Sequence, residues 1–293
     1  MTIAAGPAGV GRAKQKGPKG RSTAASIALH GTLAVASLIA VFPVVWLLLT
    51  SIKPRNAWDS ATVTLFDHPN LGNYAFVLSQ TKFLRWLVNT LIVAGATTVI
   101  GVLLAASTGY AVSRFRFPGF RSVMWMLLIT QMFPVAILIV PLYNLMAGLG
   151  LINTFPGLMI AYLTTAVPFC AWMLKGYFDT IPVQIDEAGQ VDGLTPFGTF
   201  WRLVLPLAKP GLAVAAFYSF ITAWAEVAYA TTFMTGDESY TLAVGMQSFV
   251  SEYRAEWGYM TASAVLIAIP AAVVFLLVQR HLVTGLTAGA TKS

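Results

Sequence analysis

Long apolar runs separated by short polar stretches make up most of the chain. A run of about 20 apolar residues can cross the hydrocarbon core of a bilayer as a helix, in which every backbone group finds an internal partner. Six runs come close to this length or exceed it: Ala24–Thr50, Trp86–Val112, Val123–Met146, Gly157–Leu174, Leu212–Met234 and Gly258–Val278. The pattern therefore predicts an all-α integral membrane protein with six transmembrane helices.

One long polar stretch, residues 186–211, carries helix signals of its own. Thr180 can cap a short helix, and Gly193 is a natural stop for it. Asp186 and Glu187 fall near the N-terminal end of this helix, where the helix dipole favours acidic side chains. We therefore expect the first half of the stretch to be helical.

The second half of the stretch repeats the start signal, with Thr195 followed by Pro196, and Pro206 ends it. Four apolar side chains between them follow the i, i+3, i+4, i+7 spacing of one helix face: Phe197, Phe200, Trp201 and Val204. The interpretation is a helix, a turn and a second helix over about residues 183–205, lying beside the membrane with one aromatic and one charged face. The alternative is an ordinary connecting loop.

Composition supports the membrane assignment, because 57% of the 293 residues are hydrophobic and only 10% are charged, against about 25% charged in soluble proteins. The net charge of +7 does not indicate nucleic acid, because 13 of the 18 Lys and Arg fall on one side of the predicted membrane and 5 on the other. By the positive-inside rule, both termini and the 186–211 stretch are cytoplasmic. Residues 1–22 are basic, without apolar periodicity, and are expected to be disordered.

A carboxylate inside a predicted span stands out in the fifth apolar run, at Glu226. Such a group costs about 2.5 to 3.5 kcal/mol on the insertion scale and by default marks function. The alternative is a purely structural carboxylate that hydrogen-bonds a neighbouring helix or subunit. The residues leave both interpretations open.

Two further patterns concern helix packing. Thr97, Gly101, Ala105 and Gly109 recur every four residues, a small-residue stripe that lets helices approach closely. Prolines in the third and fourth spans predict kinks there.

Chemistry is sparse elsewhere. The single cysteine, Cys170, permits no disulfide, the three histidines are scattered, and no metal or cofactor site is expected. The chain also lacks a GxxxxGK[ST] phosphate-binding loop, so any ATP must be hydrolysed by another protein.

The segment Glu187 to Gly193, EAGQVDG, followed by Leu205-Pro206, resembles the EAA motif of permease subunits in bacterial ATP-binding cassette importers. Gly189 stands where that motif has its second Ala, which weakens the first helix slightly. The segments SYTLAVGMQ and GLTAG, at 239–247 and 285–289, are similar to the MalG-like group of maltose and maltodextrin permeases. The resemblance covers nearly everything from about residue 25 onward.

This resemblance implies a type I importer permease with the MetI-like fold and a cytoplasmic coupling helix, in the inner membrane of a bacterium. The implied partners are a second, MalF-like permease subunit, two MalK-like ATP-binding subunits and an extracellular sugar-binding protein. Residues 23–284 would be the membrane domain and 285–293 a tail that reaches the ATPase subunits. The implied substrate is maltose or maltodextrin, with trehalose or another oligosaccharide as the alternative.

The resemblance also assigns site residues. The coupling residues it implies are Glu187, Ala188, Gly189, Asp192, Gly193, Phe197 and Trp201. The loop residues it implies for contact with the binding protein are Asp237, Glu238, Tyr240, Glu252 and Glu256. The tail residues are Gly285, Leu286, Thr287, Ala288 and Gly289. A rival from another class is an ion-coupled secondary carrier that uses Glu226.

Overall fold

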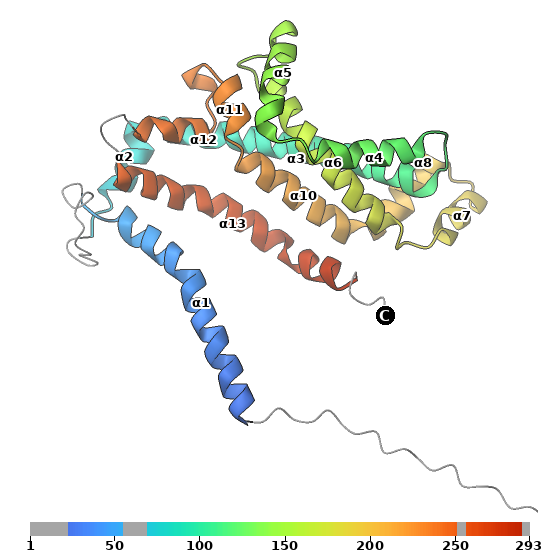
Figure 1. Ribbon diagram of the computed structural model, residues 1–293, viewed down its shortest axis with the longest axis horizontal. Helices are drawn as coiled ribbons and strands as arrows, with labels where there is room; N and C mark the ends of the chain where they lie inside the picture. Colours follow the sequence, from blue (N-terminus) through green and yellow to red (C-terminus); the bar gives the residue numbers. More distant parts are fainter. Residues whose placement is uncertain (1–22, 55–68, 251–255, 289–293) are drawn as a thin grey trace, which may run out of the picture. The chain divides into compact units, whose positions relative to one another are not determined.

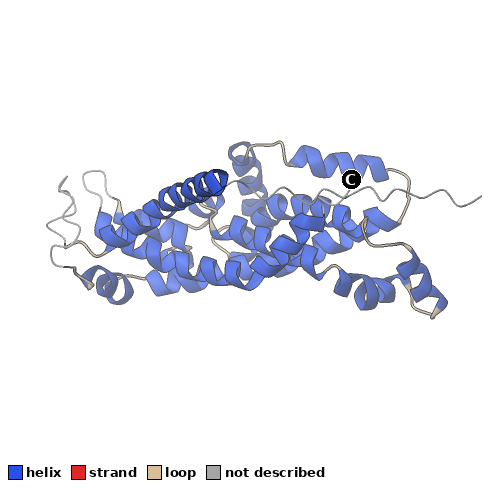
Figure 2. Cartoon of the chain, turned by 90° about the horizontal axis from the view of Figure 1, so that it is seen from below, coloured by secondary structure: helices blue, strands red, loops and turns tan. Residues whose placement is uncertain are grey.

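A computed structural model describes residues 23–54, 69–250 and 256–288, and within these ranges the chain is helical with no β-strand (Figures 1 and 2). The larger helices are α1 (Thr23–Ser51), α2 (Gly72–Gln80), α3 (Phe83–Arg114), α4 (Phe120–Thr130), α5 (Val135–Gly148), α6 (Phe155–Phe178), α10 (Lys209–Trp224), α11 (Ala228–Phe233) and α13 (Trp257–Ala288). The predicted all-α class is confirmed for this part of the chain.

The chain divides into two compact units, residues 1–46 and 47–293. The described part of the first unit is most of α1, whose apolar side chains are largely exposed, as suits a lipid or protein environment. In the second unit the end of α1 is tied to α2, because the side-chain amide of Asn73 donates to the carbonyl of Ser51 at 2.8 Å. Helix α2 lies between the first and second predicted spans.

By length and composition, four helices of the described residues could each cross a membrane: Ser26–Ser51, Phe83–Arg114, Phe155–Phe178 and Trp257–His281. Two bent pairs could each form one more span. One pair is α4 and α5, at an angle of 106°, and the other is the 196–207 segment with α10, at 83°. The described chain therefore has four to six candidate spans.

The third predicted span, Val123–Met146, is broken rather than continuous. Helix α4 ends at Thr130 and α5 starts at Val135 after Pro134, whose extended backbone (ψ 134°) cannot continue a helix. The predicted kink is thus a full break. In the fourth span Pro168 lies inside α6, and that helix continues to Phe178.

The fifth predicted span, Leu212–Met234, also needs correction. Helix α10 ends at Trp224, and α11 begins only at Ala228. The carboxylate of Glu226 accepts hydrogen bonds from the backbone N–H groups of Tyr229 and Ala230 at 2.8 and 3.1 Å, so it caps the new helix. A side chain that satisfies the first N–H groups of a helix stabilises a new start at that point.

Helix α3 is central to the second unit and packs along α6 and α10, with α10 packed in turn on α13 (Figure 1). The small-residue stripe of α3 is buried at these contacts, as predicted for packing. A Cβ on Gly109 would lie 3.0 Å from the carbonyl oxygen of Ala171 in α6, so the backbones are already close. Two buried clusters result, one around Trp86, Phe233 and their neighbours and one around Tyr110 and Phe200.

A glycine at the first cluster gives a test of this packing. A Cβ on Gly245, in α12 (Leu242–Gly245), would lie 2.2 Å from the Trp86 ring of α3. We expect Gly245→Ala to destabilise the protein by about 1–3 kcal/mol, because the helices must separate. Thermal unfolding in detergent measures this, with Gly148→Ala as the control, since nothing lies within 4 Å of a Cβ there. Equal stability of the two variants would contradict the contact.

Candidate functional site

The polar stretch after α6 folds as predicted into two helical parts beside the C-terminal end of α3. The first part is α7 (Gln184–Val191). The second consists of α8 (Pro196–Thr199), the π-helical segment η2 (Phe200–Val204) and α9 (Leu205–Leu207). The alternative of a connecting loop is wrong.

The start of α7 is fixed by a buried ion pair rather than by the predicted cap. The hydroxyl of Thr180 donates to the carbonyl of Tyr177 and does not reach α7, whose N-cap position is Val183. The guanidinium Nε of Arg114 instead donates to the Asp186 carboxylate at 2.9 Å, and both side chains are more than nine-tenths buried. The last turn of α3 therefore holds the first turn of α7.

Further hydrogen bonds complete this junction. Tyr110 lies one turn before Arg114 on α3, and its hydroxyl donates to the other Asp186 oxygen at 2.6 Å. A second Arg114 nitrogen donates to the carbonyl of Ile181 at 2.9 Å. The Tyr110 ring also packs on Phe200, with ring centroids 4.7 Å apart. Sequence reasoning placed Asp186 only near a helix start and missed this role. The sequence feature that could have indicated this role is the pairing of a basic side chain in the last turn of one helix, Arg114, with an acidic one in the first turn of another, Asp186.

The end of α7 is a Schellman turn, which confirms the predicted stop. Gly193 has φ +82°, a left-handed conformation that favours glycine. Its N–H donates to the carbonyl of Gln190 at 3.0 Å, and the N–H of Leu194 donates to that of Gly189 at 2.9 Å. Glu187, Ala188 and Asp192 are all exposed on the helix that this turn closes.

Gly189 is required by packing, which sequence reasoning missed. It is buried, and a Cβ there would lie 2.8 Å from Thr199 Oγ1 and 2.9 Å from a methyl group of Leu203. The glycine therefore lets α7 sit directly against the second part of the stretch. Glycine is a weaker helix former than alanine, but at this position only glycine leaves room for the contact with Thr199 and Leu203.

The second part begins with the predicted cap, because Thr195 Oγ1 accepts the N–H of Gly198 at 3.1 Å. The predicted single apolar face is wrong. Phe200 and Val204 are buried, whereas Phe197 is 70% exposed and Trp201 42% exposed. The π-helical turn from Phe200 changes the number of residues per turn, so the α-helical spacing no longer describes one face.

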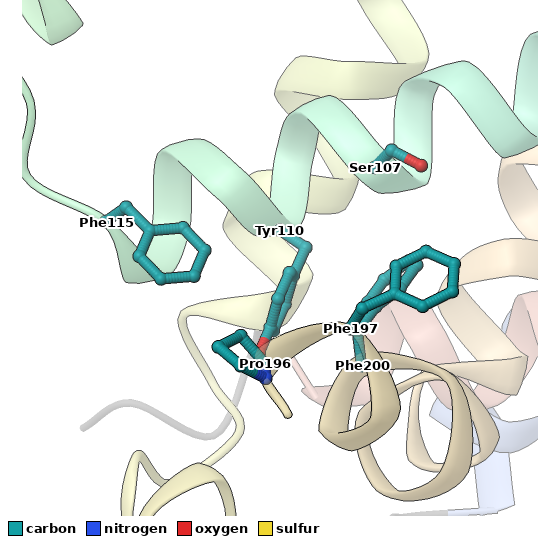
Figure 3. A pocket seen from close by; sticks show the side chains of 6 residues that line it. All are labelled: Ser107, Tyr110, Phe115, Pro196, Phe197 and Phe200. Carbon is teal, nitrogen blue, oxygen red and sulfur yellow. The ribbon is translucent and has the colours of Figure 1, made fainter. Parts of the chain in front are cut away.

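An apolar pocket of about 260 Å³ lies between α3 and α8, as Figure 3 shows. Ser107, Tyr110 and Phe115 line it from the α3 side and Pro196, Phe197 and Phe200 from the other. Together with Val191, which is 88% exposed, the pocket gives this end of the molecule an open aromatic and aliphatic surface. Apolar surface of this kind is typical of a protein contact site.

The loop residues after α11 are held against the start of α3. Lys82 pairs with both Asp237 and Glu238, and Arg85 pairs with Glu238. The Asn89 amide donates to the carbonyls of Glu238 and Tyr240 at 2.9 and 2.8 Å.

A second residue organises the same loop. Asn153, at φ +59°, accepts the N–H groups of Thr235 and Gly236 at 3.1 and 2.9 Å. The acids Asp237 and Glu238 remain about half exposed or more, and Tyr240 is half-buried.

The remaining predicted site residues are spread over the fold. Glu226 is half-buried at the break between α10 and α11 and interacts with the hydroxyl of Tyr162. Glu256 immediately precedes α13, and its N–H donates to the carbonyl of Phe249. Gly285, Leu286, Thr287 and Ala288 belong to the end of α13. Glu252, Gly289 and residues 1–22 lie outside the described residues.

Comparison with known proteins identifies the kind of molecule. Residues 97–287 match the family model described as the binding-protein-dependent transport system inner membrane component. The chain belongs to this family. The permease is 43% identical over 269 residues to the maltose/maltodextrin transport system permease protein MalG of Escherichia coli, covering 86% of this chain and 90% of MalG. It is 36% identical over 260 residues to the trehalose transport system permease protein SugB of Mycobacterium tuberculosis, covering 86% and 93%.

A solved structure shares the fold. A chain of the bacterial ABC transporter that imports the acidic polysaccharide alginate superposes with a TM-score of 0.74 at 24% identity, covering 87% of this permease and 95% of that chain. The family match and the sugar permeases among its relatives, rather than this fold likeness, show that the permease is a membrane subunit of a sugar ABC importer, as its sequence predicts. Its relatives carry different sugars, so the comparisons leave the individual sugar undetermined.

Proposed function

We propose that this permease forms half of the translocation pathway of an ATP-driven oligosaccharide importer and couples ATP hydrolysis on its partners to alternating access. The partners would be a second, MalF-like permease subunit, two MalK-like ATP-binding subunits and an extracellular sugar-binding protein. The observation that carries this proposal is the exposed surface of α7 and α8 on a rigidly closed turn.

The docking surface has the features of a helix that inserts into a groove. Glu187 supplies an exposed charge, Val191 and Phe197 supply largely exposed apolar side chains, and Trp201, which packs on Phe197 and Phe200, remains 42% exposed. Aromatic side chains that enter a partner pocket commonly dominate the energy of an interface. Glu187 would meet a basic residue of the ATP-binding subunit, and Ala188, Asp192 and Gly193 would keep the helix short and exposed.

Topology follows from the same proposal. Helix α7 would be cytoplasmic, as would both termini, in the inner membrane of a bacterium. The loop with Asp237, Glu238, Tyr240, Glu252 and Glu256 would be external and meet the binding protein. Residues 285–289 would reach toward the ATP-binding subunits.

Glu226 is better explained as a structural cap than as the ion-coupling group of a secondary carrier. Both of its carboxylate oxygens already accept backbone N–H groups at the start of α11. A group that binds and releases an ion in each cycle would have to give up these bonds. We therefore assign Glu226 to holding the helix break.

The substrate class we propose is an α-linked glucose oligosaccharide, with maltose and maltodextrin favoured over trehalose by the MalG-like segments at 239–247 and 285–289. Uptake of labelled maltotriose and of trehalose by complete complexes in proteoliposomes decides between them. We expect ATP-dependent uptake of maltotriose. Uptake of trehalose alone would overturn the maltose assignment, and uptake that ignores ATP but collapses with a proton uncoupler would overturn the importer proposal.

Glu187→Ala tests the docking surface directly. Because Glu187 forms no ion pair within the described part of the chain, its loss should leave the fold intact. We expect about tenfold lower stimulation of ATP hydrolysis by the sugar-loaded binding protein, the loss typical of one interface hot spot. Glu187→Gln, which keeps the size of the side chain, separates the charge from its packing. Normal stimulation in both variants would contradict the proposed contact.

A further inference from the structure

Helix α3 is anchored at both of its ends to the two elements that the proposed function assigns to partner proteins. At its C-terminal end, Tyr110 and Arg114 hold Asp186 of α7 through bonds of 2.6 and 2.9 Å. We call this set the inner clamp. It is buried and charge-assisted, so it fixes one geometry of α7 on α3.

The N-terminal end of α3 carries the second set of contacts. Asn89, which is 7% exposed, binds the carbonyls of Glu238 and Tyr240, and Thr90 Oγ1 accepts the N–H of Leu242 at 2.8 Å. Lys82 and Arg85 add exposed ion pairs to the same loop. We call this set the outer clamp. Its buried hydrogen bonds matter more than its exposed ion pairs, which are screened by water.

The helix between the clamps is long and runs without a break. With 32 residues it is about 48 Å long, which exceeds the roughly 30 Å of a hydrocarbon core. Among the four span-length helices of the described chain, α3 is the one without an internal proline, whereas the others contain Pro43, Pro168 and Pro270. Proline is a common cause of sharp kinks, so α3 lacks this cause of bending.

We propose that α3 is the mechanical link between the external loop and the ATPase-docking helix, so that the docked binding protein acts on α7 through α3. The inference rests on the proposed function, which supplies the partners at each end. Figure 1 shows α2 and α12 beside one end of α3. The bonds of Asp186 and the pocket between α3 and α8 place α7 and α8 at its other end. Asp186, Arg114 and Asn89 are then positioning residues, acting through the elements that they hold.

The test measures how strongly the sugar-loaded binding protein stimulates ATP hydrolysis by the complete complex. Asp186→Asn opens the inner clamp and Asn89→Leu opens the outer clamp. We expect each variant to assemble, to keep basal hydrolysis and to lose stimulation about fivefold or more, in the range of ordinary allosteric coupling. The double variant should lose no more stimulation than the more impaired of the two single variants, because both changes act on one link.

Matched variants separate coupling from folding. Asp186→Glu keeps the carboxylate and should retain most of the stimulation. Gln131→Leu removes an amide-to-carbonyl bond of 3.2 Å between the end of α4 and Thr165 of α6, outside both clamps, and should change nothing. If Asp186→Asn fails to assemble, Tyr110→Phe replaces it, because it removes one hydroxyl and keeps the ring on Phe200.

The possible results separate a failure of the α3 link from a failure of the proposed importer function. Multiplicative losses in the double variant, or normal stimulation in either single variant, would overturn the role of α3 and leave the importer proposal intact. An unmodified complex that shows no stimulation at all would overturn the proposed function, and the inference with it.

Discussion

Replacing Gly193 with proline is expected to lower ATP-driven uptake about 100-fold or more while leaving the permease in the membrane. Gly193 has φ +82°, whereas the φ of proline is fixed near −65°. The N–H of Gly193 also closes the end of α7 by donating to the carbonyl of Gln190. Proline loses that bond and turns the chain away, so α7 and α8 no longer present one surface. A misfit of about 3 kcal/mol corresponds to a loss of that size.

Uptake per membrane-inserted complex, with insertion measured separately, checks this expectation. Gly198→Ala is the matched control in the same segment, because a Cβ there meets nothing closer than 3.4 Å. It should transport normally. Near-normal uptake by the Gly193→Pro complex would show that the geometry of this turn is unimportant for coupling.

The sequence predicted the features of this region that depend on neighbouring residues. A left-handed glycine ends α7 and a threonine caps α8, and both follow from local backbone chemistry. The small-residue stripe of α3 could also be predicted from local sequence, since spacing along one helix determines which residues share a face.

The contacts between distant segments could not be predicted in this way. Arg114 and Asp186 are 72 residues apart, and their burial depends on how α3 and α6 bring α7 back to the membrane helices. The break between α10 and α11 could not be predicted either, because an apolar run does not indicate that a carboxylate, here Glu226, will cap a new helix within it. Likewise, the acidic loop after α11 showed its charge in the sequence but not the basic residues of α3 that hold it.

The apolar stripe shows where local periodicity fails. The i, i+3, i+4, i+7 rule assumes about 3.6 residues per turn, and η2 departs from this from Phe200 onward. The four side chains therefore divide between two tasks. Phe200 and Val204 support the fold, whereas Phe197 and Trp201 are exposed and are the pair that we propose for a partner contact.

This division predicts opposite results for two phenylalanines only three residues apart. Phe200 is 4% exposed and packs on Tyr110 and Phe178, so Phe200→Ala should destabilise the permease by about 3–5 kcal/mol. Phe197 is 70% exposed, so Phe197→Ala should leave thermal stability almost unchanged. If Phe197 is a docking residue, its loss should instead weaken binding of the ATP-binding subunits about tenfold.

Thermal unfolding of the purified permease and the dissociation constant for its ATP-binding partner measure the two effects separately. Phe197→Leu serves as a matched variant, because it keeps an apolar side chain and loses the ring. If Phe197→Ala unfolds early and binds its partner normally, Phe197 belongs to the core and the docking surface is misplaced. If both Phe197 variants bind normally once folded, the contact must come from Glu187, Val191 and Trp201, because these exposed side chains remain on the proposed docking surface.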